Sequence, residues 1–248
     1  MSDVKRYIRY THRGEPGYGI LHAGGELERL EGPRVDHLDQ VYLQAPVQPT
    51  KVIGIGLNYR AHAREMDKAL PAEPLMFLMP STAVIGPGDP IIRPAGFDRV
   101  DYEGELAVVF GQRARKVPAS AAAEVIAGYC CCVDVTVRDL QKRDVQYTRA
   151  KGFDTFAPLG PCLATGLDPS DLRLTTRLNG ELRQDTRTSD MIFDVPTLVQ
   201  AVTRVMTMLP GDVITTGTPS GVGQLRAGDV LEVELEGVGV LRNPVLEV

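Results

Sequence analysis

The feature that most constrains the fold is a run at residues 129–133 that has no charged side chain and ends on a carboxylate, Asp134. Its side chains are a phenol, three thiols and a valine, with no alternation of polar and apolar positions, so it predicts a central strand buried on both faces. The four cysteines show no Cys-x-x-Cys spacing, and we interpret them as small buried residues in a reducing compartment. A carboxylate at the end of such a strand is costly to desolvate unless it is hydrogen-bonded or bound to a metal.

The surrounding segments predict the α+β class with strands dominant. Residues 101–110 have the pattern of a strand and residues 118–127 that of an alanine-rich helix, and together with the central strand they suggest a crossover unit. Alternating apolar residues lead up to Asn179-Gly180, the strongest short signal for a hairpin. Asp194 is expected to cap a helix whose apolar stripe comprises Leu198, Val202, Val205 and Leu209.

Two nearby prolines, Pro46 and Pro49, predict a division of the chain because they disfavour both helix and central strand. We expect a small N-terminal β domain at residues 1–48 and a larger unit at residues 49–248. The formal net charge is −5 and the basic residues are scattered, which gives no support for a nucleic-acid partner. No stretch approaches the roughly 18 apolar residues that a membrane helix needs, and no apolar segment follows the charged N-terminus. We therefore expect a cytoplasmic protein with no membrane partner.

Three carboxylates are candidate metal ligands. Glu103 and Glu105 are two apart, so on a strand they share a face, and that face turns from acidic to apolar. Two carboxylates at the mouth of a core repel one another unless a cation lies between them, and Asp134 could join them from a neighbouring strand. Oxygen ligands alone would select Mg²⁺, Mn²⁺ or Ca²⁺. Taken separately, the pair could equally be the polar end of a strand, and Asp134 could cap a helix beginning near residue 138.

His62 and Glu65 stand three apart and would face the same way on a helix, as a general acid/base pair does. Spacing alone is equally compatible with an exposed pair of no consequence. Lys151 could bind a substrate carboxylate or be a surface lysine. The loop at residues 216–223 is rich in Gly and hydroxyls and could offer N–H groups to an anion, but it lacks the Gly-Lys-Ser/Thr of a nucleotide P-loop.

Five ordered motifs resemble those of the fumarylacetoacetate hydrolase superfamily over roughly residues 50–248. They are Gly-Leu-Asn-Tyr at 56–59 followed by His62 and Glu65, Asp-Tyr-Glu-Gly-Glu-Leu at 101–106, the segments 134–141 and 151–156, and the loop 211–223. The resemblance implies mixed, layered β-sheets in a roll or sandwich, usually as a homodimer. The small N-terminal part resembles an appendage of bacterial members that are isomerases.

The resemblance also implies roles for the site residues. Glu103, Glu105 and Asp134 would hold Mg²⁺ or Mn²⁺, and Ca²⁺ could replace them in a crystal. His62 and Glu65 would act as a catalytic dyad on a closing lid, together with Lys151. The implied substrate-binding residues are Tyr59, Gln141, Gly217 and Thr218. One departure is Met79, which stands where many relatives carry the lysine of a Phe-x-Lys-Pro motif.

The implied activity is metal-dependent enolate chemistry on a small 2-oxo or enol carboxylate. Because of the N-terminal appendage we favour a 2-hydroxyhepta-2,4-diene-1,7-dioate isomerase or decarboxylase type in aromatic catabolism. The alternatives are C–C hydrolysis of an acylpyruvate such as fumarylpyruvate and decarboxylation of oxaloacetate. A metal-dependent ligand-binding module without turnover is the non-enzymatic alternative.

Overall fold

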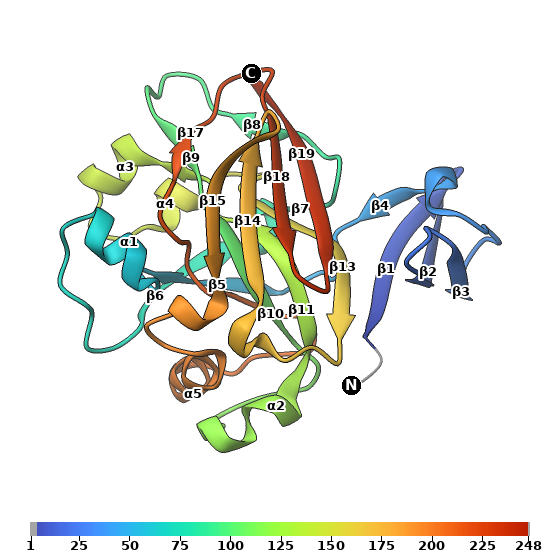
Figure 1. Ribbon diagram of the computed structural model, residues 1–248, viewed down its shortest axis with the longest axis horizontal. Helices are drawn as coiled ribbons and strands as arrows, with labels where there is room; N and C mark the ends of the chain where they lie inside the picture. The colour runs from blue at the N-terminus through green and yellow to red at the C-terminus, as the bar shows by residue number, and fades with distance from the viewer. Residues whose placement is uncertain (1–3, 248) are drawn as a thin grey trace.

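The computed structural model describes residues 4–247 and arranges their strands in three sheets (Figure 1). The largest sheet has the order β3-β2-β1-β13-β11-β10-β16-β5-β6, and β4 and β7 pair with β1 and β13. Its strands are β1 (Lys5–His12), β2 (Glu15–Leu21), β3 (Leu27–Glu31), β4 (Tyr42–Gln44), β5 (Lys51–Gly56), β6 (Leu75–Pro80), β7 (Val84–Ile85), β10 (Gly104–Phe110), β11 (Ile126–Val133), β13 (Ala157–Thr165) and β16 (Val213–Thr215).

A five-stranded sheet, in the order β15-β14-β18-β19-β8, lies against the large one, and β12-β9-β17 form a third, small sheet. These strands are β8 (Ile91–Arg93), β14 (Arg173–Leu178), β15 (Glu181–Arg187), β18 (Val230–Leu235), β19 (Gly239–Glu247), β9 (Val100–Tyr102), β12 (Thr136–Val137) and β17 (Gly223–Gln224). The mixed sheets confirm the predicted α+β class, and β14 and β15 form the hairpin predicted at Asn179-Gly180.

Strand β11 is central, as its apolar run predicts, because β10 and β13 pair with it on either side and its residues from Gly128 on are buried. The expected crossover unit is wrong: β10 and β11 are antiparallel neighbours joined by a short helical connection. The helix predicted at residues 118–127 is shorter than expected. Helix α2 ends at Val125, because the chain pairs with β10 from Ile126 onward.

The predicted single strand at residues 101–110 is broken at Glu103. Strand β9 before the break pairs with β12 and β17, whereas β10 after it pairs with β11 and β16. The carboxylate of Glu103 therefore lies where the chain passes from one sheet to another.

The described part of the chain also has five α-helices and several single-turn 3-10 helices. The α-helices are α1 (Arg60–Glu65), α2 (Ala122–Val125), α3 (Arg138–Arg143), α4 (Thr148–Lys151) and α5 (Val195–Val205). Asp194 caps α5 as predicted, by accepting a hydrogen bond from the Thr197 N–H at 2.9 Å. The predicted stripe is only partly correct, since α5 ends at Val205, which is 60% exposed, and Leu209 lies beyond it. Within residues 4–247 no helix is long and apolar enough to cross a membrane.

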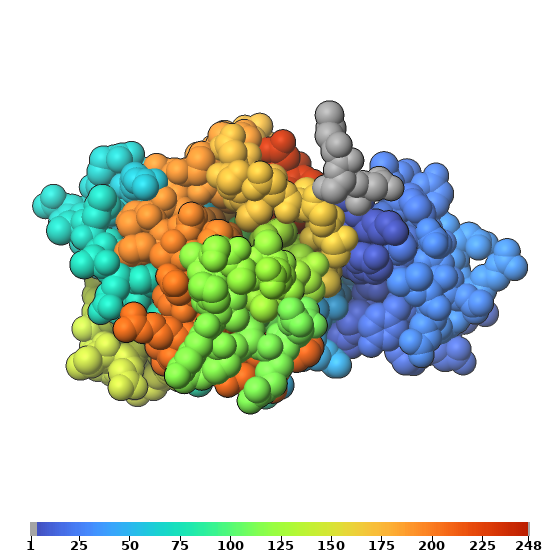
Figure 2. All heavy atoms as spheres, turned by 90° about the horizontal axis from the view of Figure 1, so that it is seen from below, coloured from blue at the N-terminus to red at the C-terminus, as the bar shows by residue number. Residues whose placement is uncertain are grey.

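The N-terminal strands form a lobe at one end of the molecule (blue in Figures 1 and 2). This lobe is joined to the body by hydrogen bonds between β1 and β13, in register from Lys5↔Thr165 to Tyr7↔Leu163. The division of the chain at residues 48–49 stays a prediction.

Candidate metal centre

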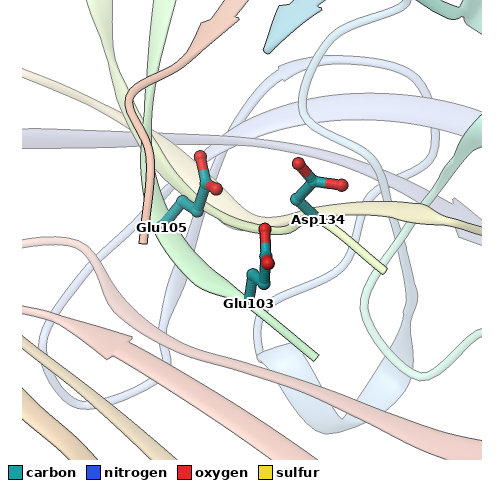
Figure 3. A group of neighbouring side chains, drawn as sticks. All are labelled: Glu103, Glu105 and Asp134. Carbon is teal, nitrogen blue, oxygen red and sulfur yellow. The ribbon is translucent and has the colours of Figure 1, made fainter. Parts of the chain in front are cut away.

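Glu103, Glu105 and Asp134 converge in the centre of the molecule. One ligand oxygen from each lies within 4.8 Å of the others, and all three residues are buried. Figure 3 shows their carboxylates pointing toward a common space. The β10–β11 register explains this arrangement, because it pairs Gly104 with Val133 and thereby places Asp134, the next residue, opposite Glu103. The Asp134 N–H also donates to the Glu103 carbonyl at 2.9 Å.

Lys151 lies among these carboxylates. Its ammonium donates to Glu103 Oε2 at 2.9 Å and to Asp134 Oδ2 at 2.6 Å, and it also contacts Thr136 Oγ1 at 2.7 Å. The residue is 2% exposed, so a surface lysine is excluded. The alternative of Asp134 as a helix cap is also wrong, because the cap of α3 is Val137 and makes no side-chain bond.

Arg138 was not assigned a role from the sequence, yet it organises the same cluster. Its guanidinium donates to Glu103 Oε1 at 2.6 Å, to Asp101 Oδ2 at 2.8 Å and to Gln141 Oε1 at 2.8 Å. Asp101, two residues before Glu103, is thereby tied to Arg138 and to Arg99 and is not part of the triad. The available signal was an arginine four residues after a buried aspartate, at the start of a helix.

The three carboxylates differ in electrostatic environment. Although burial alone would raise it, Lys151 and Arg138 hold the pKa of Glu103 down to about 2. Burial, only partly offset by Lys151, raises the pKa of Asp134 to about 6. Burial, followed by the charges of Asp134 and Glu103, raises the pKa of Glu105 well above its ordinary value. Negative charge is therefore least compensated between Glu105 and Asp134.

This uncompensated region fits a divalent cation. Glu105 accepts one hydrogen bond, from the Gly217 N–H at 2.8 Å, and Asp134 Oδ1 is buried without a hydrogen-bond partner. A buried oxygen that keeps a free lone pair is costly unless a ligand satisfies it. Because every available donor atom is a carboxylate oxygen, the site suits Mg²⁺ or Mn²⁺.

A cavity of about 620 Å³ opens onto this cluster, and His62 of the expected dyad lines it. His62 and Glu65 lie on α1, with His62 Nδ1 and Glu65 Oε2 2.9 Å apart. The other Glu65 oxygen accepts from the Gly221 N–H at 3.2 Å, which holds α1 against the loop after β16. The His62 ring is one tenth exposed and shares the cavity wall with Lys151.

The remaining predicted site residues occupy different positions. Gln141 and Thr218 line the cavity, whereas the Gly217 N–H is used by Glu105. Tyr59 is fully buried in the core, outside the cavity wall, and its hydroxyl has no hydrogen-bond partner among the described residues. Met79 is also fully buried and packs in an apolar cluster, while Phe77 two residues earlier lines the cavity.

Comparison with known proteins agrees with this architecture. Residues 51–246 match the model of the fumarylacetoacetate hydrolase C-terminal domain. The structure of 5-carboxymethyl-2-hydroxymuconate delta-isomerase from Mycobacterium smegmatis superposes with a TM-score of 0.91 at 45% identity, covering 98% of this chain and 99% of that one. The mitochondrial oxaloacetate tautomerase FAHD2B of Bos taurus is 37% identical over 98% of this chain and 80% of its own length.

A third relative bears on the metal. Maleylpyruvate hydrolase from Sphingobium sp. SYK-6, solved in complex with manganese(II) and pyruvate, has a TM-score of 0.82 at 28% identity and covers 98% of this chain and 99% of its own. These relatives are enzymes, and the resemblance inferred from the five motifs is confirmed. The chain belongs to the fumarylacetoacetate hydrolase family.

Proposed function

We propose that the protein is a divalent-metal-dependent enzyme that moves a proton through the enolate of a small 2-oxo carboxylate, as an isomerase or tautomerase. The observation that carries this proposal is the cavity whose wall includes both Asp134, with its unpartnered Oδ1, and His62, which is paired with Glu65. Glu103, Glu105 and Asp134 would hold the metal. When bound, the cation stabilises negative charge on the substrate oxygens.

His62 is the proposed acid/base. Because its Nδ1 is engaged by Glu65, its orientation is fixed and Nε2 remains available to accept or return a proton at the substrate carbon. The Glu65 carboxylate is itself held by the Gly221 N–H, so the dyad stays in place only while α1 lies against that loop.

Lys151 serves as a cation and not as a base. Its Nζ is directed at three acceptors, the Glu103 and Asp134 carboxylates and the Thr136 hydroxyl, as an ammonium would be. Burial lowers the pKa of Lys151, but the carboxylates of Asp134 and Glu103 raise it above its ordinary value. A substrate carboxylate or enolate oxygen bound here would accept from Lys151 in place of one of these three acceptors. Gln141, on the cavity wall, can contribute a further hydrogen bond.

A C–C hydrolase is the second candidate, because the same dyad could activate water and because the Sphingobium relative is a maleylpyruvate hydrolase. Decarboxylation of oxaloacetate and non-catalytic ligand binding are further outcomes of the same test. The homodimer and a role in aromatic catabolism stay predictions from the resemblance, and the cytoplasmic location stays a prediction from the composition.

The test is a substrate panel followed by NMR and ultraviolet absorbance: the enol of oxaloacetate, a hydroxymuconate-type diacid and acylpyruvates, each with Mg²⁺ and with EDTA. We expect metal-dependent ketonisation or isomerisation. His62→Gln should lower that rate by about 10²–10⁴ while Mn²⁺ affinity, measured by calorimetry, stays unchanged. His22→Gln is the matched control, because His22 is a half-exposed side chain of the N-terminal lobe. Full turnover in EDTA, or wild-type rates from His62→Gln, would contradict the proposal.

A further inference from the structure

Gln184 is an unusual residue on strand β15. It is 1% exposed, whereas five of the seven residues of this edge strand are exposed. The register with β14 shifts here: Thr176 pairs with Gln184 and Arg177 with Leu182, so Arg183 is an extra residue, a β-bulge. Bulges beside functional sites redirect a side chain, and this one turns the Gln184 amide into the protein.

The amide joins two segments of the candidate site. Its Oε1 accepts from the Gly104 N–H at 3.1 Å, and its Nε2 donates to Thr218 Oγ1 at 2.9 Å and to the Pro219 carbonyl at 3.0 Å. Thr218 Oγ1 donates in turn to the Gly104 carbonyl at 3.0 Å, which closes a ring of hydrogen bonds. Gly104 separates Glu103 from Glu105, and Thr218 lines the cavity.

The packing around this ring leaves no space for larger residues. A Cβ on Gly104 would lie 2.1 Å from Thr176 Oγ1 and 3.0 Å from Gln184 Oε1. A Cβ on Gly221 would lie 2.1 Å from the carbonyl of Arg183, and the Gly221 N–H is the group that holds Glu65. The bulge therefore supports both the loop that carries Thr218 and the anchor of the His62–Glu65 dyad.

We propose that Gln184 is a positioning residue for the reaction, which fixes the Thr218 loop relative to the strand that carries Glu103 and Glu105. Gln184 itself does not line the cavity, so it acts through these segments. The inference rests on the proposed function above. Backbone pairing between β10 and β11, extended by the bond from the Asp134 N–H to the Glu103 carbonyl, holds the backbone of all three carboxylates. Loss of the amide should therefore displace the loop more than the metal ligands.

The experiment compares Gln184→Met, which keeps the side-chain length but removes every hydrogen bond, with Gln184→Glu, which keeps the acceptor for Gly104 and loses both donors. Gln112→Met is the matched control, since this exposed amide donates to the Glu124 carbonyl far from the cavity. Three quantities are measured: Mn²⁺ affinity by calorimetry, oxalate affinity in saturating Mn²⁺, and kcat and KM for the enol of oxaloacetate.

We expect Mn²⁺ affinity to stay close to that of the wild type in both variants, oxalate affinity to be lowered, and kcat/KM to be reduced by about 10- to 100-fold. Gln112→Met should match wild type in all three. Variants that equal wild type in oxalate binding and turnover would overturn the inference, and so would a loss confined to Mn²⁺ affinity. A wild-type protein that neither binds Mn²⁺ nor turns over substrate would instead refute the proposed function.

Discussion

Two buried aspartates of this protein, Asp212 and Asp134, have opposite surroundings. Asp212 is fully buried, and both of its carboxylate oxygens have hydrogen-bond donors. Its Oδ1 accepts from the Thr50 N–H (2.9 Å), the Thr50 hydroxyl (2.7 Å) and the Lys51 N–H (3.2 Å). Its Oδ2 accepts from the Leu209 N–H (2.8 Å) and the Lys51 ammonium. Asp134 is as buried, but one oxygen bonds Lys151 and the other has no partner.

The difference separates a structural carboxylate from one with capacity for a ligand. Asp212 joins the start of β5 to the turn before β16, and no lone pair remains for anything else to bind. Asp134 lies beside Glu105, which has one backbone donor and no cation in contact among the described residues. Burial alone therefore does not identify a site; incomplete satisfaction of a buried group does.

The largest expected effect is on metal binding. Glu105→Gln removes a ligand charge but keeps an oxygen that can accept from the Gly217 N–H, so we expect Mn²⁺ affinity to fall by more than about 100-fold. At a metal concentration 100 times the wild-type Kd, Mn²⁺ should raise the free energy of unfolding by about 2.7 kcal/mol in the wild type and by no more than about 0.4 kcal/mol in the variant. In EDTA the free energy of unfolding of the variant should equal or exceed that of the wild type, since the repulsion between Glu105 and the neighbouring carboxylates is relieved. Unfolding in urea with and without Mn²⁺ measures both quantities. If Mn²⁺ stabilises the variant as much as the wild type, Glu105 is not a metal ligand.

The converse change, Asp212→Asn, should leave Mn²⁺ affinity unaltered and lower the free energy of unfolding. The expected loss is about 2 kcal/mol, because several donors lose their charged acceptor while Lys51, 21% exposed, can still reach water. Urea denaturation and calorimetry check the two quantities. A reduced metal affinity at full stability would show that Asp212 is not the structural member of the pair.

A smaller effect follows from pH. Although burial alone would raise it, hydrogen bonds from Lys51, Leu209 and Thr50 hold the pKa of Asp212 below its ordinary value. A depressed folded-state pKa stabilises the fold above the unfolded value of about 3.9, and this stabilisation is lost as the pH falls through the folded pKa. The stability gap between wild type and Asp212→Asn should therefore be constant from about pH 5 to 7 and narrow below about pH 4. A stability difference between the two proteins that increases as the pH falls would contradict this prediction.

Local sequence patterns predicted part of the candidate site. The spacing of Glu103 and Glu105, and the abrupt charge at Asp134 after an apolar strand, were sufficient to predict that the three could converge. The break at Glu103 was not foreseen, because pairing of β9 with β12 and β17 depends on segments distant in the sequence. Gln184 had no local signal at all, since its environment depends on a bulge defined by the partner strand.

The predicted elements show the same limit. The hairpin at Asn179-Gly180 follows from turn chemistry that is local, and Asn179 does adopt a positive φ of 55°. The crossover unit and the far end of the α5 stripe were wrong because propensity does not specify which strand becomes a neighbour or where a helix leaves the core.

The sequence by itself determined the family, the α+β class and the carboxylates of the candidate metal centre, because these are encoded in short ordered motifs and in the period of apolar residues. Only the tertiary structure decided that Lys151 and Arg138 enter the acidic cluster, that Tyr59 lies outside the cavity and that one oxygen of Asp134 has no partner. The reason is physical: burial and hydrogen-bond satisfaction are properties of contacts between distant segments, and no single segment contains them.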